Sequence, residues 1–262
     1  IDNMDFRSDR NSIGNNLLLN YLPALTKQHT YSLASLYPYA TQPNGEIGFQ
    51  VELFNRYRPN TTLGGKYGTN ISINYSRANS LDTLNFNDPR GYSSEFLSIG
   101  SEIYFQDINV EINKKISDKV KIIANYINLI YNKAVIEKPG EPTVYAHVGI
   151  VDLTYRLTKQ KSLRTELQHL LTEQDKGNWA MLLAEYSVAP NWYVTAFDEY
   201  NYGNDDEKKR LHYFSGSVAY VKRANRFSLS YGRQREGIFC VGGICRTVPA
   251  SNGIFFSVTS SF

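Results

Sequence analysis

The stretch Asn252-Gly253-Ile254-Phe255-Phe256-Ser257-Val258-Thr259-Ser260-Ser261-Phe262 decides how the rest of the chain is interpreted. Ile254, Phe256, Val258, Ser260 and Phe262 form a mostly apolar set, and Ser257, Thr259 and Ser261 form a small polar set between them. A period of two is typical of an extended strand with one apolar and one polar face. Its length matches the roughly 9–11 residues that a tilted strand needs to cross a bilayer.

The aromatic residue at the end of this strand resembles the assembly signal of bacterial outer-membrane barrels. We therefore take Ile254, Phe256, Val258 and Phe262 as the candidate signal. The alternative is a soluble edge strand that ends in Phe. Soluble proteins seldom finish on a long, exposed apolar strand, because such an edge invites aggregation.

Composition fits a single all-β domain. The chain has 262 residues, and its 28 basic and 25 acidic side chains are scattered, so no nucleic-acid partner is expected. The mean hydropathy is −0.40, and no run of about 18 apolar residues predicts a transmembrane helix. A barrel is compatible with such values because half of each strand faces a polar lumen. The 20 tyrosines suit strand ends that are wet on one side, and they also occur in Tyr-rich soluble sandwiches.

Alternation recurs along most of the chain, with tight turns near Asp118, Gln160, Pro190 and Ala224 and longer connections between them. The longer connections are 78–100, 133–142, 203–210 and 236–248. Bacterial barrels have short turns at one rim and long loops at the other. The sequence therefore predicts a closed, antiparallel, up-and-down transmembrane β-barrel of about 12 strands, or 14 or more if further N-terminal strands exist.

The N-terminal part is assigned as a lead-in segment, an additional strand or a plug at 1–27, followed by the barrel at 28–262. The barrel's first strand is expected at His29–Ala40. The chain begins at Ile1 without an initiator Met or a signal peptide, so we expect a processed product or a piece of something longer.

Charged residues on the polar faces are expected to line the lumen. They are Glu52, Glu111, Lys121, Asp152, Arg156, Arg164, Glu166 and Glu185. We expect Glu111 to face Lys121 across one tight turn, and Arg156 to lie diagonally from Glu166 across the next. Such pairs favour a filled or narrow lumen over a wide pore.

Two cysteines occur, in Cys240-Val-Gly-Gly-Ile-Cys245. A structural disulfide across a Gly242-Gly243 turn is the favoured interpretation, and it requires an oxidising compartment. A metal site would need further ligands, and a redox pair would favour a Cys-x-x-Cys spacing.

No catalytic, metal or cofactor site is predicted. His29, His147, His169 and His212 stand far apart in sequence, and no Gly-x-Ser-x-Gly motif supports a lipase based on the outward His169. The carboxylates could flank a substrate, but they are balanced by nearby basic residues.

Two stretches are similar to a family of Bacteroidota outer-membrane proteins catalogued only as a domain of unknown function. One is Gly-Ile-Phe-Cys-Val-Gly-Gly-Ile-Cys-Arg-Thr-Val-Pro-Ala-Ser-Asn-Gly at 237–253, together with the terminal Ser-Phe. The other is Leu-Asn-Tyr-Leu-Pro-Ala-Leu-Thr-Lys-Gln-His-Thr-Tyr at 19–31. The resemblance implies an outer-membrane barrel without an established activity, of which this chain is a C-terminal portion.

These observations predict a structural or binding subunit of an outer-membrane assembly. The alternative is a small-solute transport pore, and an outer-membrane enzyme ranks behind both. The expected partners are outer-membrane lipid, the barrel assembly machinery and other outer-membrane proteins of a complex.

Overall fold

The structure is a computed structural model that describes residues 7–8, 17–18, 24–42, 45–83, 94–241 and 244–260. For residues 7–8, 17–18, 95–96 and 237–248 it describes the backbone alone. Within these ranges the chain is almost entirely β-structure, with one short helix α1 (Lys133–Ile136) and one 3-10 turn η1 (Glu207–Lys209). No helix of the described ranges has the length and apolar character that crossing a membrane requires.

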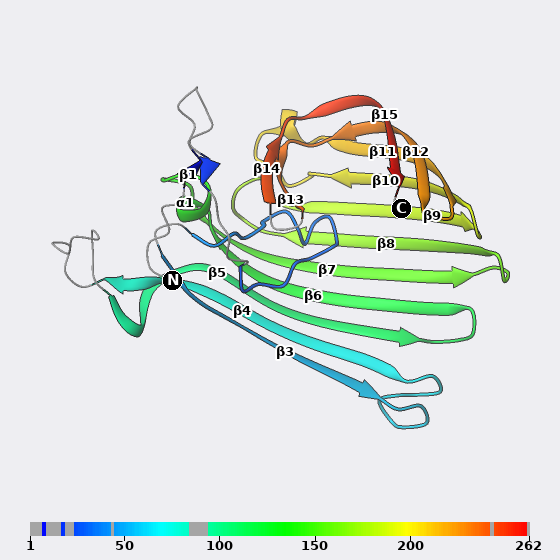
Figure 1. Cartoon of the computed structure of the whole chain (residues 1–262), viewed down its shortest axis with the longest axis horizontal. Coiled ribbons are helices and arrows are strands. Elements are labelled where there is room, and N and C mark those ends of the chain that lie inside the picture. Colours follow the sequence, from blue (N-terminus) through cyan, green and yellow to red (C-terminus); the bar gives the residue numbers. More distant parts are fainter. Residues whose placement is uncertain are drawn as a thin grey trace.

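Eleven strands form one antiparallel sheet in which each strand pairs with its neighbour in sequence (Figure 1). They are β3 (Ile47–Tyr57), β4 (Thr69–Thr83), β5 (Ser94–Lys115), β6 (Val120–Asn132), β7 (Thr143–Arg156), β8 (Lys161–Leu171), β9 (Trp179–Val188), β10 (Trp192–Tyr200), β11 (His212–Lys222), β12 (Asn225–Gln234) and β15 (Ser251–Ser260). The all-β, antiparallel, up-and-down prediction is confirmed.

From β5 onward, turn lengths separate the two rims of the sheet, whereas the long connection 58–68 between β3 and β4 lies at the same rim as the tight turns. The connections 116–119, 157–160, 189–191 and 223–224 are tight and lie at one rim, on the right of Figure 1. The connections that contain α1 and η1 are longer and lie at the other rim. Ser260 of β15 pairs with Asn225, so the last described strand ends at the tight-turn rim. This arrangement follows the parity that the sequence predicts.

The sheet has two opposite faces, which we call inner and outer. Along β7, Val144, Ala146, Val148 and Ile150 are buried on the inner face, whereas Tyr145 and Val151 are exposed on the outer face. The predicted outward rows behave in the same way on other strands. In β15, Ile254 and Phe256 are 74% and 70% exposed.

The sheet differs from the prediction in strand number and closure. It has 11 strands instead of about 12, and β3 and β15 are its edges, without a second neighbour among the described strands. Residues 78–100, predicted as a loop, continue β4 to Thr83 and begin β5 at Ser94. The sequence of this stretch shows no clear apolar alternation, yet the backbone of its described residues pairs across the register shifts that begin at Ala78.

The region 29–40, predicted as the first strand, is not a strand. We call residues 24–42 the inner segment, because they run across the inner face as turns and coil (Figure 1). The N–H of Ser35 bonds to the carbonyl of Tyr31, and the N–H of Leu36 bonds to that of Leu33. The apolar residues of this region therefore face the sheet from a series of turns, and their spacing does not indicate a strand.

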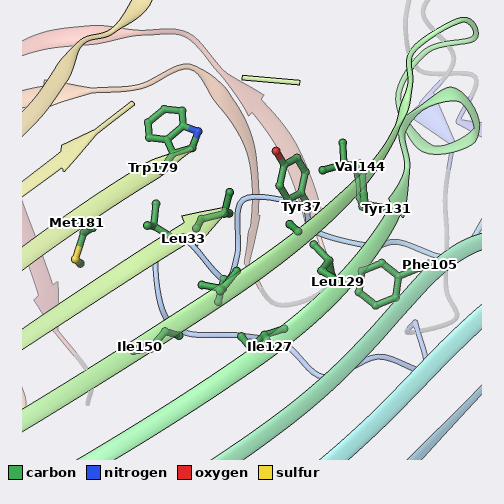
Figure 2. Packing of buried hydrophobic residues seen from close by; sticks show 14 of the residues in the cluster. Leu33, Tyr37, Phe105, Ile127, Leu129, Tyr131, Val144, Ile150, Trp179 and Met181 are labelled. Carbon is green, nitrogen blue, oxygen red and sulfur yellow. The ribbon is translucent and has the colours of Figure 1, made fainter. Parts of the chain in front are cut away.

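The inner segment forms one hydrophobic core with the sheet. Figure 2 shows Leu33 and Tyr37 among side chains of β5, β6, β7 and β9, including Phe105, Tyr131 and Trp179. Leu33 is only 1% exposed. Strands β6 and β7 therefore carry apolar residues on both faces in this half of the sheet, which is typical of strands covered on both sides.

Two small hairpins stand apart from the main sheet. β13 (Gly237–Val241) pairs with β14 (Ile244–Val248), and this pair lies between β12 and β15 in sequence. β1 (Arg7–Ser8) pairs with β2 (Leu17–Leu18).

Candidate functional site on the inner face

Buried polar contacts hold the first part of the inner segment over the polar half of the inner face. The ring Nε2 of His29 lies 2.5 Å from Oδ2 of Asp107 on β5. Lys27 donates to Asn109 at 3.1 Å and contacts Glu52 of β3 at 3.3 Å. Asp107 and Asn109 are fully buried, and these contacts satisfy Oδ2 of Asp107 and Oδ1 of Asn109, whereas Oδ1 of Asp107 has no hydrogen-bond partner among the described residues.

A charged cluster on β7 and β8 lies beneath the middle of the inner segment. The guanidinium of Arg164 contacts Asp152 at 2.8 Å and also contacts Glu166. Gln168 donates to Glu166 and accepts a hydrogen bond from the Leu33 N–H at 2.8 Å. Asp152 and Glu166 are buried and sit directly opposite each other, so Arg164 compensates two adjacent carboxylates.

The remaining contacts bind the inner segment to later parts of the chain. Ser32 donates to Glu199 of β10 at 2.6 Å, and Arg235 donates to the other oxygen of the same carboxylate at 2.9 Å. The Tyr37 hydroxyl donates to Asp175 at 3.2 Å. Lys133 of α1 lies 2.7 Å from Asp175 as well. The segment is therefore anchored directly from β3 to β10, and Arg235 supports the anchoring carboxylate of Glu199.

Two cavities remain between the inner segment and the C-terminal strands. One, of about 400 Å³, is lined by residues that include Tyr31, Arg164, Glu166 and Phe197. The other, of about 330 Å³, is lined by residues that include Glu199, Tyr213 and Arg233. Ser32 and Phe197 line both. Aromatic rings beside paired charges can bind a small polar ligand, and these two cavities form the candidate site.

The surroundings of the inner segment disfavour ionisation of its tyrosine hydroxyls and of the nearby Glu46 carboxyl. Burial, together with the nearby carboxylates of Asp152 and Glu111, raises the pKa of Tyr31 to about 12. Burial also raises the pKa of Tyr37 and of Tyr39. Burial raises the pKa of Glu46 above its ordinary value, although Tyr39 and the Gln42 N–H donate hydrogen bonds to its carboxylate.

The predicted charged residues divide into a central group and a rim group. Asp152, Arg164 and Glu166 form the cluster above, and Glu185 lies opposite Arg164 on β9. Glu52 contacts Lys27 of the inner segment. Glu111 lies between Ser72 and Asn125, and Lys121 and Arg156 lie exposed near the tight-turn rim.

Both specific pairings predicted across the tight turns are wrong. Lys121 lies opposite Lys115, and Glu111 lies opposite Asn125, because the hairpin is centred at residue 118, whereas a Glu111–Lys121 pair would require a centre at residue 116. Arg156 lies opposite Ser162, so Arg164 takes the place beside Glu166 that was assigned to Arg156. A shift of register by a few residues is enough to exchange charged partners.

The remaining predicted site residues lie at the end of the chain. Cys240 and Cys245 are directly opposite each other in the backbone register of β13 and β14, and their disulfide stays a prediction. Ile254, Phe256 and Val258 are exposed on the outer face of β15. Phe262 and the Gly242-Gly243 turn lie outside the described residues.

Sequence reasoning missed the residues that anchor the inner segment, above all Ser32, Leu33, Gln168 and Glu199. One signal was present, because Ile123 and Ile127 break the polar set of β6. Ile127 is buried in the core under the inner segment. An apolar residue at one of the otherwise polar alternating positions of a strand therefore indicates that the inner face is covered there.

Among the described ranges, no group of three or more His, Cys, Asp or Glu side chains is arranged to hold a metal ion. The fold and site define an all-β protein whose curved sheet binds a segment of its own chain across the inner face. The chain belongs to the Family of unknown function (DUF6029), whose model matches residues 1–262. None of the curated proteins matches it.

Proposed function

We propose that this protein is an outer-membrane β-barrel protein that acts as a structural or binding subunit of an outer-membrane assembly. The observation that carries the proposal is the apolar outer face. Every strand of the main sheet except β6 exposes at least one large aliphatic or Phe side chain there, and β6 exposes Tyr126. An apolar surface of this extent marks contact with a membrane or a partner.

Two further features support membrane insertion. From β5 onward the tight turns and the longer connections lie at opposite rims, as in bacterial outer-membrane barrels, although the long connection 58–68 lies at the tight-turn rim. The rings of Trp192 and Tyr220 pack in a tilted arrangement near the tight-turn rim, with centroids 4.8 Å apart, where an interfacial aromatic girdle is expected. The resemblance noted for residues 19–31 and 237–253 favours an outer membrane of the Bacteroidota.

The inner segment favours a subunit over the alternative, a small-solute pore. Its core and its buried hydrogen bonds cover the centre of the inner face. A transport path would have to displace these contacts or pass beside them. The cavities beside Ser32 would then serve for binding of a small ligand or of a partner's side chain, and not for passage.

The test combines membrane extraction with electrical recording. We expect the protein to remain with the membrane after alkaline carbonate washing and to give almost no conductance in planar bilayers. A large, steady conductance would support the pore instead. Recovery in the aqueous fraction would overturn the membrane placement. Native purification with identification of co-purifying proteins tests the assembly itself.

A further inference from the structure

A groove of about 770 Å³ crosses the outer face. It follows one continuous cross-strand row from β6 to β11, in which each residue is the register partner of the next. The row is Tyr126, Gly149, His169, Ala180, Tyr200 and His212. Gly149 and Ala180 leave the hollows between larger rings, and a Cβ added at Gly149 would meet no atom within 4 Å.

Polar contacts fix the rings that form the walls of the groove. The Tyr126 hydroxyl lies 2.7 Å from Nδ1 of His147, and His169 Nε2 lies 2.6 Å from the Tyr202 hydroxyl. The rings of Tyr200 and His212 stack with centroids 3.9 Å apart and an interplanar angle of 4°. Since these side chains are already held by partners, the groove is preformed.

The floor of the groove continues into a second, apolar cross-strand row, which is displaced by two residues along each strand. Ala124, Val151, Leu167 and Leu182 lie in this row, and all of them line the groove. Asp198 is the last residue of this row that lines the groove. It lies between two exposed apolar neighbours, Leu182 and Phe214. A carboxylate between apolar side chains on the outer face is costly in a membrane, and such residues mark functional sites.

Asp198 lacks the partners that a carboxylate in this position needs. The Asp198 side chain is 41% exposed and His212 lies 2.8 Å from its Oδ2, whereas Oδ1 is shielded from solvent and has no hydrogen-bond partner among the described residues. An ammonium group would donate hydrogen bonds to this carboxylate, and the Tyr200 ring beside it favours a cation. A phosphate in the same place would be repelled by the negative charge.

We propose that the groove binds a phospholipid with a primary ammonium headgroup, with the ammonium at Asp198 and an acyl chain over Leu167 and Leu182. The proposal rests on the membrane placement proposed above. The N–H donors of a primary ammonium match a carboxylate acceptor, whereas a quaternary ammonium has none to offer.

Native mass spectrometry of the full chain in neutral detergent tests this inference. The probes are dioleoyl phosphatidylethanolamine and dioleoyl phosphatidylglycerol at equal concentration. We expect the ethanolamine lipid to be retained about fivefold to tenfold better, the range that one partly exposed ion pair with an aromatic neighbour supports. Asp198→Asn should bring the two lipids to parity. Gly149→Leu should fill the hollow and weaken binding of both.

Gly216→Leu is the matched control. Gly216 also lies on the outer face, and a Cβ there also meets no atom within 4 Å, but it does not line the groove. This variant should bind lipid as the wild type does. Equal binding of both lipids by the wild type, or unchanged binding by Gly149→Leu, would overturn the inference.

Two further outcomes separate the possible failures. Equal retention of dioleoyl phosphatidylcholine would assign recognition to the rings and reject the primary-ammonium specificity. A protein that inserts into bilayers but shows no headgroup preference contradicts this inference alone. A protein that stays in water without detergent contradicts the proposed function itself.

Discussion

Leu33 is the most deeply buried side chain that the inner segment contributes to the core. Leu33→Ala should destabilise docking of the segment by about 2–5 kcal/mol, because the truncation removes apolar contacts and leaves a cavity. Hydrogen exchange of residues 31–37 in detergent measures the loss. Leu25→Ala is the control, since Leu25 is exposed in the same segment and its loss should be nearly neutral. Equal loss of protection in both variants would contradict the assigned contact.

We predict that Glu46 makes docking of the inner segment pH-dependent. Burial raises the pKa of its carboxyl above the ordinary value of 4.5, so the folded protein holds this proton at a pH where the unfolded chain has released it. Its contribution to stability is therefore greatest below pH 4.5 and declines as the pH rises from there toward the folded pKa. Hydrogen exchange of residues 38–42 should show more protection in acid than at pH 7. Glu46→Gln should flatten this profile, and a variant with the wild-type profile would reject the assignment.

At the scale of single strands, β7 offers a direct test of which face is which. Val151 is outward and Asp152 is 5% exposed and inward. A cysteine at 151 in a lipid-embedded wall should resist a water-only thiol reagent, in a protein whose two native cysteines are replaced. A cysteine at 152 should react whenever water reaches the inner face. If the 151 site is labelled as readily as the 152 site, the assigned faces are wrong.

The β13–β14 hairpin places Cys240 opposite Cys245 in its backbone register. We predict a disulfide between them, which stabilises the folded protein by about 2 kcal/mol in the loop-entropy model because the ring is small. Mass spectrometry of non-reduced peptides should find the cross-linked pair. Two free thiols in protein isolated without reductant would reject it.

The strands show where sequence reasoning succeeds and where it stops. Alternation around Val51, Ile73, Val151 and Leu229 was enough to assign the outward rows, because a period of two has a single physical meaning in an exposed strand. The cross-strand partner of each residue is harder to predict. The pairing of Lys121 with Lys115 depends on the centre of a turn, and turn residues do not fix a register to within one residue.

The inner segment could not be predicted because its pattern is ambiguous. Tyr31, Leu33 and Tyr37 are spaced in a way that also suits a strand, and only the inner face of β6 and β7 decides between the two. The candidate cavities join Ser32 with Glu199, which are 167 residues apart in sequence. No local signal connects such residues before the fold is known.

At the scale of the whole molecule, Phe262 tests whether the terminal strand acts as an assembly signal. In sequence the residue follows β15, whose last residue, Ser260, pairs with Asn225 at the tight-turn rim. Phe262→Ala should lower the protein level in the outer membrane strongly, because the assembly machinery would lose its signal. Refolding in detergent should change little, since one apolar side chain contributes at most about 1.5–3 kcal/mol. Normal insertion in cells would remove the signal role, and failure to refold in detergent would assign Phe262 a packing role instead.

The inner segment also sets an order of events during folding. It precedes every strand of the main sheet in the chain, yet Leu33 bonds to Gln168, 135 residues later, and Ser32 bonds to Glu199. Contacts of such sequence separation form late, because the intervening loop must first be closed by other structure. The part of the sheet that is synthesised first therefore has to wait, with its apolar inner face uncovered, until β8 and β10 have joined it. We therefore expect the nascent chain to depend most on chaperones in the interval before the inner segment docks on that face.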